Sequence, residues 1–160
     1  MATEKLKFKL ELYATMWDKP PHAEILIGDK SYFHKDITGT EDKPDLIEFE
    51  HELEEGKSYE LIIKRTGKTR NQTVINDKGD ILKDQLLHMK SMYIDEIELG
   101  ALVYEGVYTP EYPEPWATQQ KEAGNQLPKT LKNVTQMGHN GEWSFEFESP
   151  FYMWLLENLY

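Results

Sequence analysis

Acidic and amide side chains gather in one short segment, Asn76-Asp77-Lys78-Gly79-Asp80, and Asp84 follows four residues later. Calcium takes about six to eight oxygen ligands, and short loops rich in Asp and Asn that contain glycine can supply several of them. We therefore predict a candidate calcium site at Asp77, Asp80 and Asp84, completed by backbone carbonyls. The twelve-residue register of an EF-hand is absent, and the same segment also fits an ordinary Asn-Asp turn.

Aromatic side chains recur in a proline-rich segment. Tyr108, Tyr112 and Trp116 lie four residues apart, and three prolines fall between positions 110 and 115. Exposed aromatic rings can stack on the faces of sugars or anchor a protein interface. These three residues are therefore candidates for contact with a glycan or a partner protein. The alternative is that their rings fold back over an open sheet edge.

Pairs of glutamates two residues apart could support acid–base chemistry. They are Glu48 and Glu50, Glu96 and Glu98, and Glu146 and Glu148. On a strand each pair points to one face, as the two carboxylates of a glycoside hydrolase could. Such pairs also arise on the solvated face of an acidic sandwich. Because no serine lies in a nucleophile-elbow pattern and the five histidines are scattered singly, we predict that the protein is not an enzyme.

Basic residues concentrate between positions 57 and 70. They are Lys57, Lys64, Arg65, Lys68 and Arg70. We interpret the stretch from Lys64 to Arg70 as a solvated hairpin tip around Gly67. The alternative is a surface that forms ion pairs with an acidic partner.

The elements that must position these residues are mainly strands. Apolar and polar residues alternate with a period of two, most clearly from Leu6 to Leu12 and from Trp143 to Phe147. Shorter runs of this kind occur at 25–27, 47–49 and 59–63, and 89–99 also reads as a strand. Gly28-Asp29-Lys30 predicts a hairpin turn. Strands at this spacing predict an all-β fold, an antiparallel β-sandwich that is jelly-roll-like.

Two segments interrupt the strand pattern. The prolines predict an extended surface arm over 108–138, with a short helix from Ala117 to Ala123, so that the sandwich would comprise 1–107 and 139–149. Ser149 can cap a helix whose first turn holds Pro150, which predicts a short apolar helix within 150–160. One face of that helix can dock on the sandwich. Tyr152, Met153 and Leu156 lie on its other sides and are predicted to form an assembly interface.

The charge balance narrows the possible partners. The 160 residues include 18 Lys and Arg against 29 Asp and Glu, which gives a formal net charge of −11. A field of that sign repels phosphate backbones and anionic membrane surfaces, so we expect no nucleic-acid partner. The absence of cysteine excludes disulfides and thiolate metal sites. No apolar run approaches the roughly 20 residues of a membrane span.

The stretch from Leu6 to Gly100 resembles the calcium-dependent, xylan-binding type of carbohydrate-binding module. The shared order is an opening strand, the segments Glu24–Asp29 and Val74–Asp77, and a closing segment Tyr93–Gly100. The resemblance implies that the loop after Asn76-Asp77 supplies calcium ligands, with Asp77, Asp80 and Asp84 in those positions. It further implies that the ion in turn holds sugar hydroxyls.

The whole chain is similar to small sandwich proteins encoded by tailed phages of marine bacteria, in which such a module is followed by an arm and an apolar end like Ser149–Asn158. This resemblance implies a non-enzymatic structural or adsorption protein on the capsid surface or the tail. Its partners would be other virion proteins, in a homo-oligomer or a multicopy assembly. It would be made in the host cytoplasm and located in the virion. The alternatives are a stand-alone calcium-dependent glycan-binding module and a glycosidase that uses paired glutamates.

Overall fold

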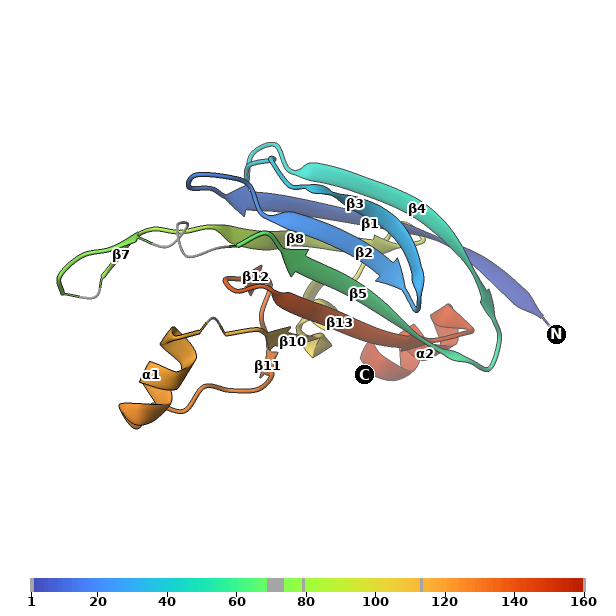
Figure 1. The fold of residues 1–160 in the computed structure, drawn as a ribbon. Helices are drawn as coiled ribbons and strands as arrows, with labels where there is room; N and C mark the ends of the chain where they lie inside the picture. The colour runs from blue at the N-terminus through green and yellow to red at the C-terminus, as the bar shows by residue number, and fades with distance from the viewer. Residues whose placement is uncertain (1, 69–73, 79, 113, 160) are drawn as a thin grey trace.

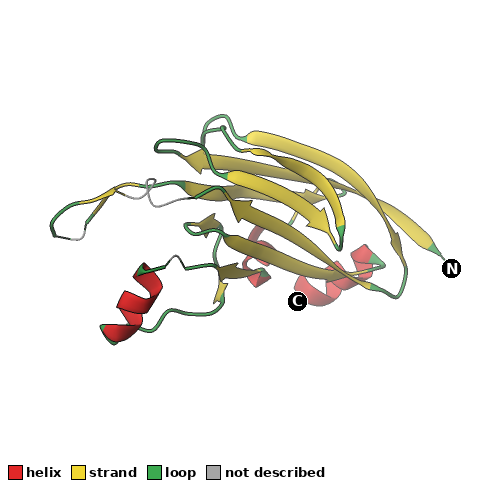
Figure 2. Ribbon diagram, in the orientation of Figure 1, coloured by secondary structure: helices red, strands yellow, loops and turns green. Residues whose placement is uncertain are grey.

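Two antiparallel sheets pack face to face and enclose the core, as the ribbons in Figures 1 and 2 show. The computed structural model describes residues 2–68, 74–78, 80–112 and 114–159. The first sheet has the strand order β12-β8-β1-β4, with β9 paired to β8, and the second has the order β11-β10-β13-β5-β2-β3. The predicted all-β sandwich is therefore confirmed.

The strands and helices have the following bounds. The first sheet contains β1 (Thr3–Thr15), β4 (Asp45–Glu54), β8 (Leu86–Ile94), β9 (Ile97–Glu98) and β12 (Gln136–Met137). The second contains β2 (His22–Ile27), β3 (Lys30–Asp36), β5 (Ser58–Thr66), β10 (Val107–Pro110), β11 (Leu131–Lys132) and β13 (Gly141–Glu148). A separate hairpin pairs β6 (Val74–Ile75) with β7 (Ile81–Lys83). The helices are η2 (Gly100–Glu105), α1 (Trp116–Glu122) and α2 (Phe151–Leu159).

The alternation of residue types explains which side of each sheet faces the core. In β1, Leu6, Phe8, Leu10 and Leu12 are buried, while the lysines between them point outward. In β13, Trp143, Phe145 and Phe147 are buried in the same way. Phe8 meets Phe147 across the sandwich with ring centroids 5.9 Å apart. Burying each such side chain contributes roughly 1.5–3 kcal/mol, so these two strands hold the sheets together.

The hairpin turn at Gly28-Asp29 is confirmed, because β2 ends at Ile27 and β3 begins at Lys30. The prediction of one strand over 89–99 needs correction. Asp95 and Glu96 have φ angles of 54° and 69°, in the left-handed region, and they form the turn between β8 and β9. A pair of left-handed residues reverses the chain, so the strand cannot continue through them.

Helix α2 is present where the sequence predicted a helix, but its amino-terminal cap comes from elsewhere. The Glu4 carboxylate, on β1, accepts hydrogen bonds from the backbone N–H of Phe151 at 2.9 Å and from the Ser149 hydroxyl. A carboxylate satisfies a free N–H of the first turn and also favours the positive end of the helix dipole. The prediction that Ser149 itself caps the helix is therefore wrong.

The prolines predicted an extended arm over 108–138 outside the sheets, but part of this segment pairs within the second sheet. Strand β10 pairs with β13 on one side and β11 on the other, and its last residue, Pro110, lies opposite Gly141. Proline is tolerated here because it ends the strand. Helix α1 confirms the predicted short helix and stands away from the sandwich in Figure 1. None of the described helices is long and apolar enough to cross a membrane.

Candidate functional site

Two of the three predicted calcium ligands, Asp80 and Asp84, are already engaged by protein side chains. Asn76 Oδ1 accepts hydrogen bonds from the backbone N–H groups of Lys78 and Asp80, both at 2.9 Å, which is the geometry of an Asx turn. Asn76 Nδ2 donates to Asp80 Oδ2 at 3.2 Å, and Asp84 forms an ion pair with Lys68 at 2.8 Å. In the described part of the chain, no group of three or more ligand side chains could hold a metal ion. The structure does not bring Asp77, Asp80 and Asp84 together as a site, and calcium binding stays a prediction.

The prediction that Lys64 to Arg70 form a solvated hairpin tip is wrong for Arg65, which occupies a buried polar network, and Arg70 lies outside the described residues. On β5 it follows Leu61 and Ile63 on the core side, and its side chain is fully buried. Its guanidinium donates to Asn140 Oδ1 at 2.8 Å and to the carbonyl of Gln85 at 2.6 Å. Burial lowers the pKa of Arg65 to about 10, which leaves the group charged at neutral pH. The network thus fixes the loop before β13 to the start of β8.

The three predicted aromatic contacts do not lie together. Tyr108 is buried on β10, where its hydroxyl exchanges hydrogen bonds with the backbone of His139, and burial raises its pKa to about 12. It is therefore unavailable to a ligand. The reason is its register position opposite Trp143, which places the ring on the core side of the second sheet.

Tyr112 and Trp116 do meet, and a residue that the sequence did not single out joins them. Their ring centroids are 6.0 Å apart, and His139 lies 5.2 Å from Tyr112 and 5.7 Å from Trp116. Burial, and then the Lys68 ammonium, lower the pKa of His139, so its ring is neutral at pH 7. Because the three rings pack on one another, they connect the start of α1 to the loop before β13, and contact of Tyr112 and Trp116 with a glycan or a partner stays a prediction.

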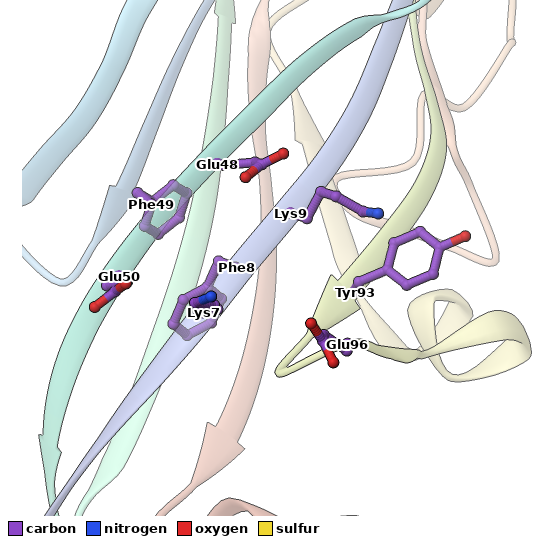
Figure 3. Close-up of a pocket in the computed structure, with 8 residues that line it drawn as sticks. All are labelled: Lys7, Phe8, Lys9, Glu48, Phe49, Glu50, Tyr93 and Glu96. Atoms are coloured by element: carbon purple, nitrogen blue, oxygen red, sulfur yellow. The ribbon is translucent and has the colours of Figure 1, made fainter.

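A groove of about 630 Å³ lies over the first sheet, where β1, β4 and β8 run side by side (Figure 3). Eight residues line it: Lys7, Phe8, Lys9, Glu48, Phe49, Glu50, Tyr93 and Glu96. The strand register places Lys7 opposite Glu50, and Lys9 between Glu48 and Tyr93. Alternation puts these polar side chains on the outer face. The predicted pair Glu48 and Glu50 therefore belongs to a defined surface feature.

The groove places the Tyr93 ring beside polar groups of both signs. Lys9 Nζ lies 4.3 Å from the centroid of the Tyr93 ring. Glu50 forms an ion pair with Lys5 at 3.4 Å. Within the described ranges, Lys7, Glu48 and Glu96 form no ion pair. Donors and acceptors are thus available on several sides of the ring.

The turn at Asp95-Glu96 fixes one end of this groove. The Asp95 carboxylate accepts hydrogen bonds from the backbone N–H of Lys7 at 3.3 Å and from the Tyr152 hydroxyl of α2. The bond to Asp95 raises the pKa of Tyr152 to about 12, so the phenol stays protonated as the donor. Glu96 follows with its left-handed backbone and lines the groove. Helix α2 therefore helps to position a groove residue.

The other carboxylate pairs do not form such a feature. Glu146 and Glu148 point outward from β13 and are exposed. Glu96 and Glu98 are separated by the end of the turn, because Glu96 lies in the turn and Glu98 on β9. These positions give no enclosed site in which two carboxylates would flank a sugar.

The outer side of α2 is apolar, as the sequence predicted. Phe151 and Leu155 are buried, and Phe151 packs against Phe147 with ring centroids 6.2 Å apart. Tyr152, Met153 and Leu156 are 46%, 61% and 60% exposed. Whether these three residues form an assembly interface stays a prediction.

The fold is that of an all-β sandwich with a short carboxyl-terminal helix. No protein-family model and no curated protein matches the chain. Among solved structures, the chain is similar to vCBM60. That structure comes from a study of circular permutation as an evolutionary link between two families of calcium-dependent carbohydrate-binding modules. The identity is 10%, the TM-score is 0.49, and the match covers 88% of this chain and 89% of that one. A structure of vCBM60 in complex with galactobiose matches with 11% identity, a TM-score of 0.49, and coverage of 87% and 96%. At this level of similarity neither match assigns a family or a ligand to the chain.

Proposed function

We propose that the protein is a non-enzymatic glycan-binding protein whose site is the groove over the first sheet. The observation that carries this proposal is the placement of the Tyr93 ring among Lys7, Glu48 and Glu96, which form no ion pair in the described ranges. The groove is open to solvent along the strands, so an extended ligand fits better than a compact one. Each lining side chain comes from a strand or a two-residue turn, which keeps the surface ordered.

The chemistry of the groove matches that of a sugar. A sugar hydroxyl both donates and accepts hydrogen bonds, so it can pair with a carboxylate on one side and an ammonium on the other. The apolar face of a sugar ring can stack on an aromatic ring such as Tyr93. The groove holds two lysines and three glutamates. This mixed charge favours a neutral glycan over a strongly anionic one.

Replacing Tyr93 with alanine is expected to weaken glycan binding by about tenfold, because the stacking surface is lost. A glycan array with wild-type protein, run once with calcium and once with chelator, identifies the ligand and tests the calcium dependence. Isothermal titration then measures the affinity of each variant. Tyr104→Ala is the matched control, because Tyr104 is an exposed tyrosine on η2 that does not line this groove. Equal affinities of wild type and Tyr93→Ala would reject the site, and an empty array would reject the function.

A second candidate function is a structural role in a phage virion. The specific observation that favours an assembly role is the exposed apolar side of α2, formed by Tyr152, Met153 and Leu156. Large apolar side chains exposed together on one helix are typical of an interaction surface, and a neighbouring copy or another virion protein could cover them. Mass spectrometry of purified phage particles, with copy number, tests this role and its location.

Leu156→Lys is expected to weaken self-association at least tenfold and to leave the free energy of unfolding within about 0.5 kcal/mol of wild type. Light scattering over a concentration series measures the first quantity, and urea denaturation measures the second. Leu82→Lys is the control, because Leu82 is 60% exposed on β7, on a different element. A monodisperse wild-type monomer at micromolar concentration would contradict self-assembly through α2.

A further inference from the structure

We propose that His22 and His34, on the outer face of the second sheet, form a binding site for a divalent transition-metal ion, with Cu²⁺ bound most tightly. The two residues lie on neighbouring strands, β2 and β3. Their imidazole rings are in contact, with centroids 4.6 Å apart and an angle of 67° between the ring planes. They are twelve positions apart in the sequence, and the hairpin at Gly28-Asp29 brings them together.

Each of the two imidazoles has a carboxylate beside the same ring nitrogen. His22 Nδ1 lies 2.8 Å from Asp36 Oδ1, and His34 Nδ1 lies 3.7 Å from Glu24 Oε2. The strand register explains both contacts, because His22 is opposite Asp36 and Glu24 is opposite His34. A carboxylate at Nδ1 favours the tautomer with its proton on that nitrogen, which leaves the lone pair on Nε2.

At His22 this arrangement is the one that metal-binding histidines use in proteins, whereas Glu24 lies near His34 without a hydrogen bond to it. A ligating imidazole usually donates its second N–H to a carboxylate, which fixes the ring and makes the coordinating nitrogen more basic. Here the two imidazoles touch, and rotation of the more exposed His34 side chain can bring both Nε2 atoms to about 2.0–2.1 Å from one ion. The side chain of His34 is 61% exposed and that of His22 is 27% exposed, so an ion has access from solvent.

The donor set selects the class of metal. Imidazole nitrogen suits Cu²⁺, Ni²⁺ and Zn²⁺, whereas calcium and magnesium require oxygen ligands. Among the described residues there is no third protein ligand, so water or a ligand from outside completes the coordination. The order of affinity is then expected to place Cu²⁺ above Ni²⁺ and Zn²⁺. This site lies on the opposite sheet from the groove and does not depend on glycan binding.

Titration of the full chain with Cu²⁺ alone tests the site. The wild type is expected to bind one ion with nitrogen hyperfine coupling from imidazole in the electron paramagnetic resonance spectrum. His22→Ala and His34→Ala should each lower the affinity at least tenfold, and the double variant should lose the signal. His88→Ala is the control, because it removes an imidazole from the first sheet, beside Tyr13, and should leave copper binding unchanged. Circular dichroism confirms that each variant is folded.

The carboxylates provide a second test. Asp36→Asn removes the charge beside Nδ1 of His22 and is expected to weaken copper binding by about 10-fold or more while retaining nitrogen coupling, because Asp36 positions the ligand without touching the metal. Unchanged affinity in both histidine variants, or a wild-type copper signal without imidazole coupling, would overturn the proposal. Copper retained by the double variant would do the same, because the ion would then be bound elsewhere.

Discussion

Replacing Gly106 with alanine should destabilise the protein by about 3 kcal/mol or more, the value expected when a methyl group is forced into a packed core. Gly106 follows η2 with a φ of −64°, so alanine meets no backbone strain there. The obstacle is space: an added Cβ would lie 2.6 Å from Nε1 of Trp143 and closer still to two ring carbons. Trp143 is fully buried and stacks on Phe145, so its ring cannot move aside.

Urea denaturation of Gly106→Ala and Gly138→Ala measures this effect. Gly138 is the matched control, because a Cβ there would lie 3.5 Å from Leu86 Cδ2, which is ordinary van der Waals contact. We expect Gly138→Ala to stay within about 1 kcal/mol of wild type. If Gly106→Ala were as stable as Gly138→Ala, the Trp143 ring would have moved to make room for the methyl group. The core beside η2 would then be loosely packed, and the prediction would be wrong.

Arg65→Ala should cost about 3–5 kcal/mol, because it empties a filled volume and removes the donor of a buried network. The Gln85 carbonyl loses its bond from Arg65, whereas Asn140 Oδ1 still accepts from the backbone N–H of Lys68 at 3.0 Å. Thermal and urea denaturation measure the loss.

Arg65→Met separates volume from hydrogen bonding. Methionine refills most of the space without a charge, and removal of a buried charge relieves the desolvation that lowers the pKa of Arg65. The remaining penalty should be about 1–3 kcal/mol, that of an unsatisfied carbonyl. If Arg65→Met were as unstable as Arg65→Ala, the hydrogen bonds and not the packing would dominate this network.

The strands could be predicted from the sequence because burial on one face imposes a period of two. Leu6 to Leu12 and Trp143 to Phe147 carry that signal plainly. Arg65 carries the opposite signal: its charge indicates exposure, although its position two residues after Ile63 places it on the core side. At this position the charge of the side chain predicts exposure and the strand period predicts burial. The structure agrees with the strand period, because Arg65 is buried.

The candidate sites were harder to predict because they depend on register between strands. Tyr93 and Lys9 are 84 positions apart, and only the pairing of β1 with β8 makes them neighbours. The contact of His22 with His34 follows from the predicted hairpin at Gly28-Asp29, because antiparallel pairing of its two strands makes these residues neighbours. Glu4 as the cap of α2 had no local signal, because its partners lie at the other end of the sequence.

That last contact has a consequence for the order of folding. Glu4 and Phe151 are 147 residues apart, so their bond closes one of the longest loops in the chain. During synthesis β1 leaves the ribosome before the segment that forms α2. Contacts of such high sequence separation form slowly, because the chain entropy lost on closure is large. Until α2 docks, Phe145 lacks its ring contact with Trp154 and Phe147 lacks its ring contact with Phe151, so the last part of the core closes only when the two ends of the chain meet.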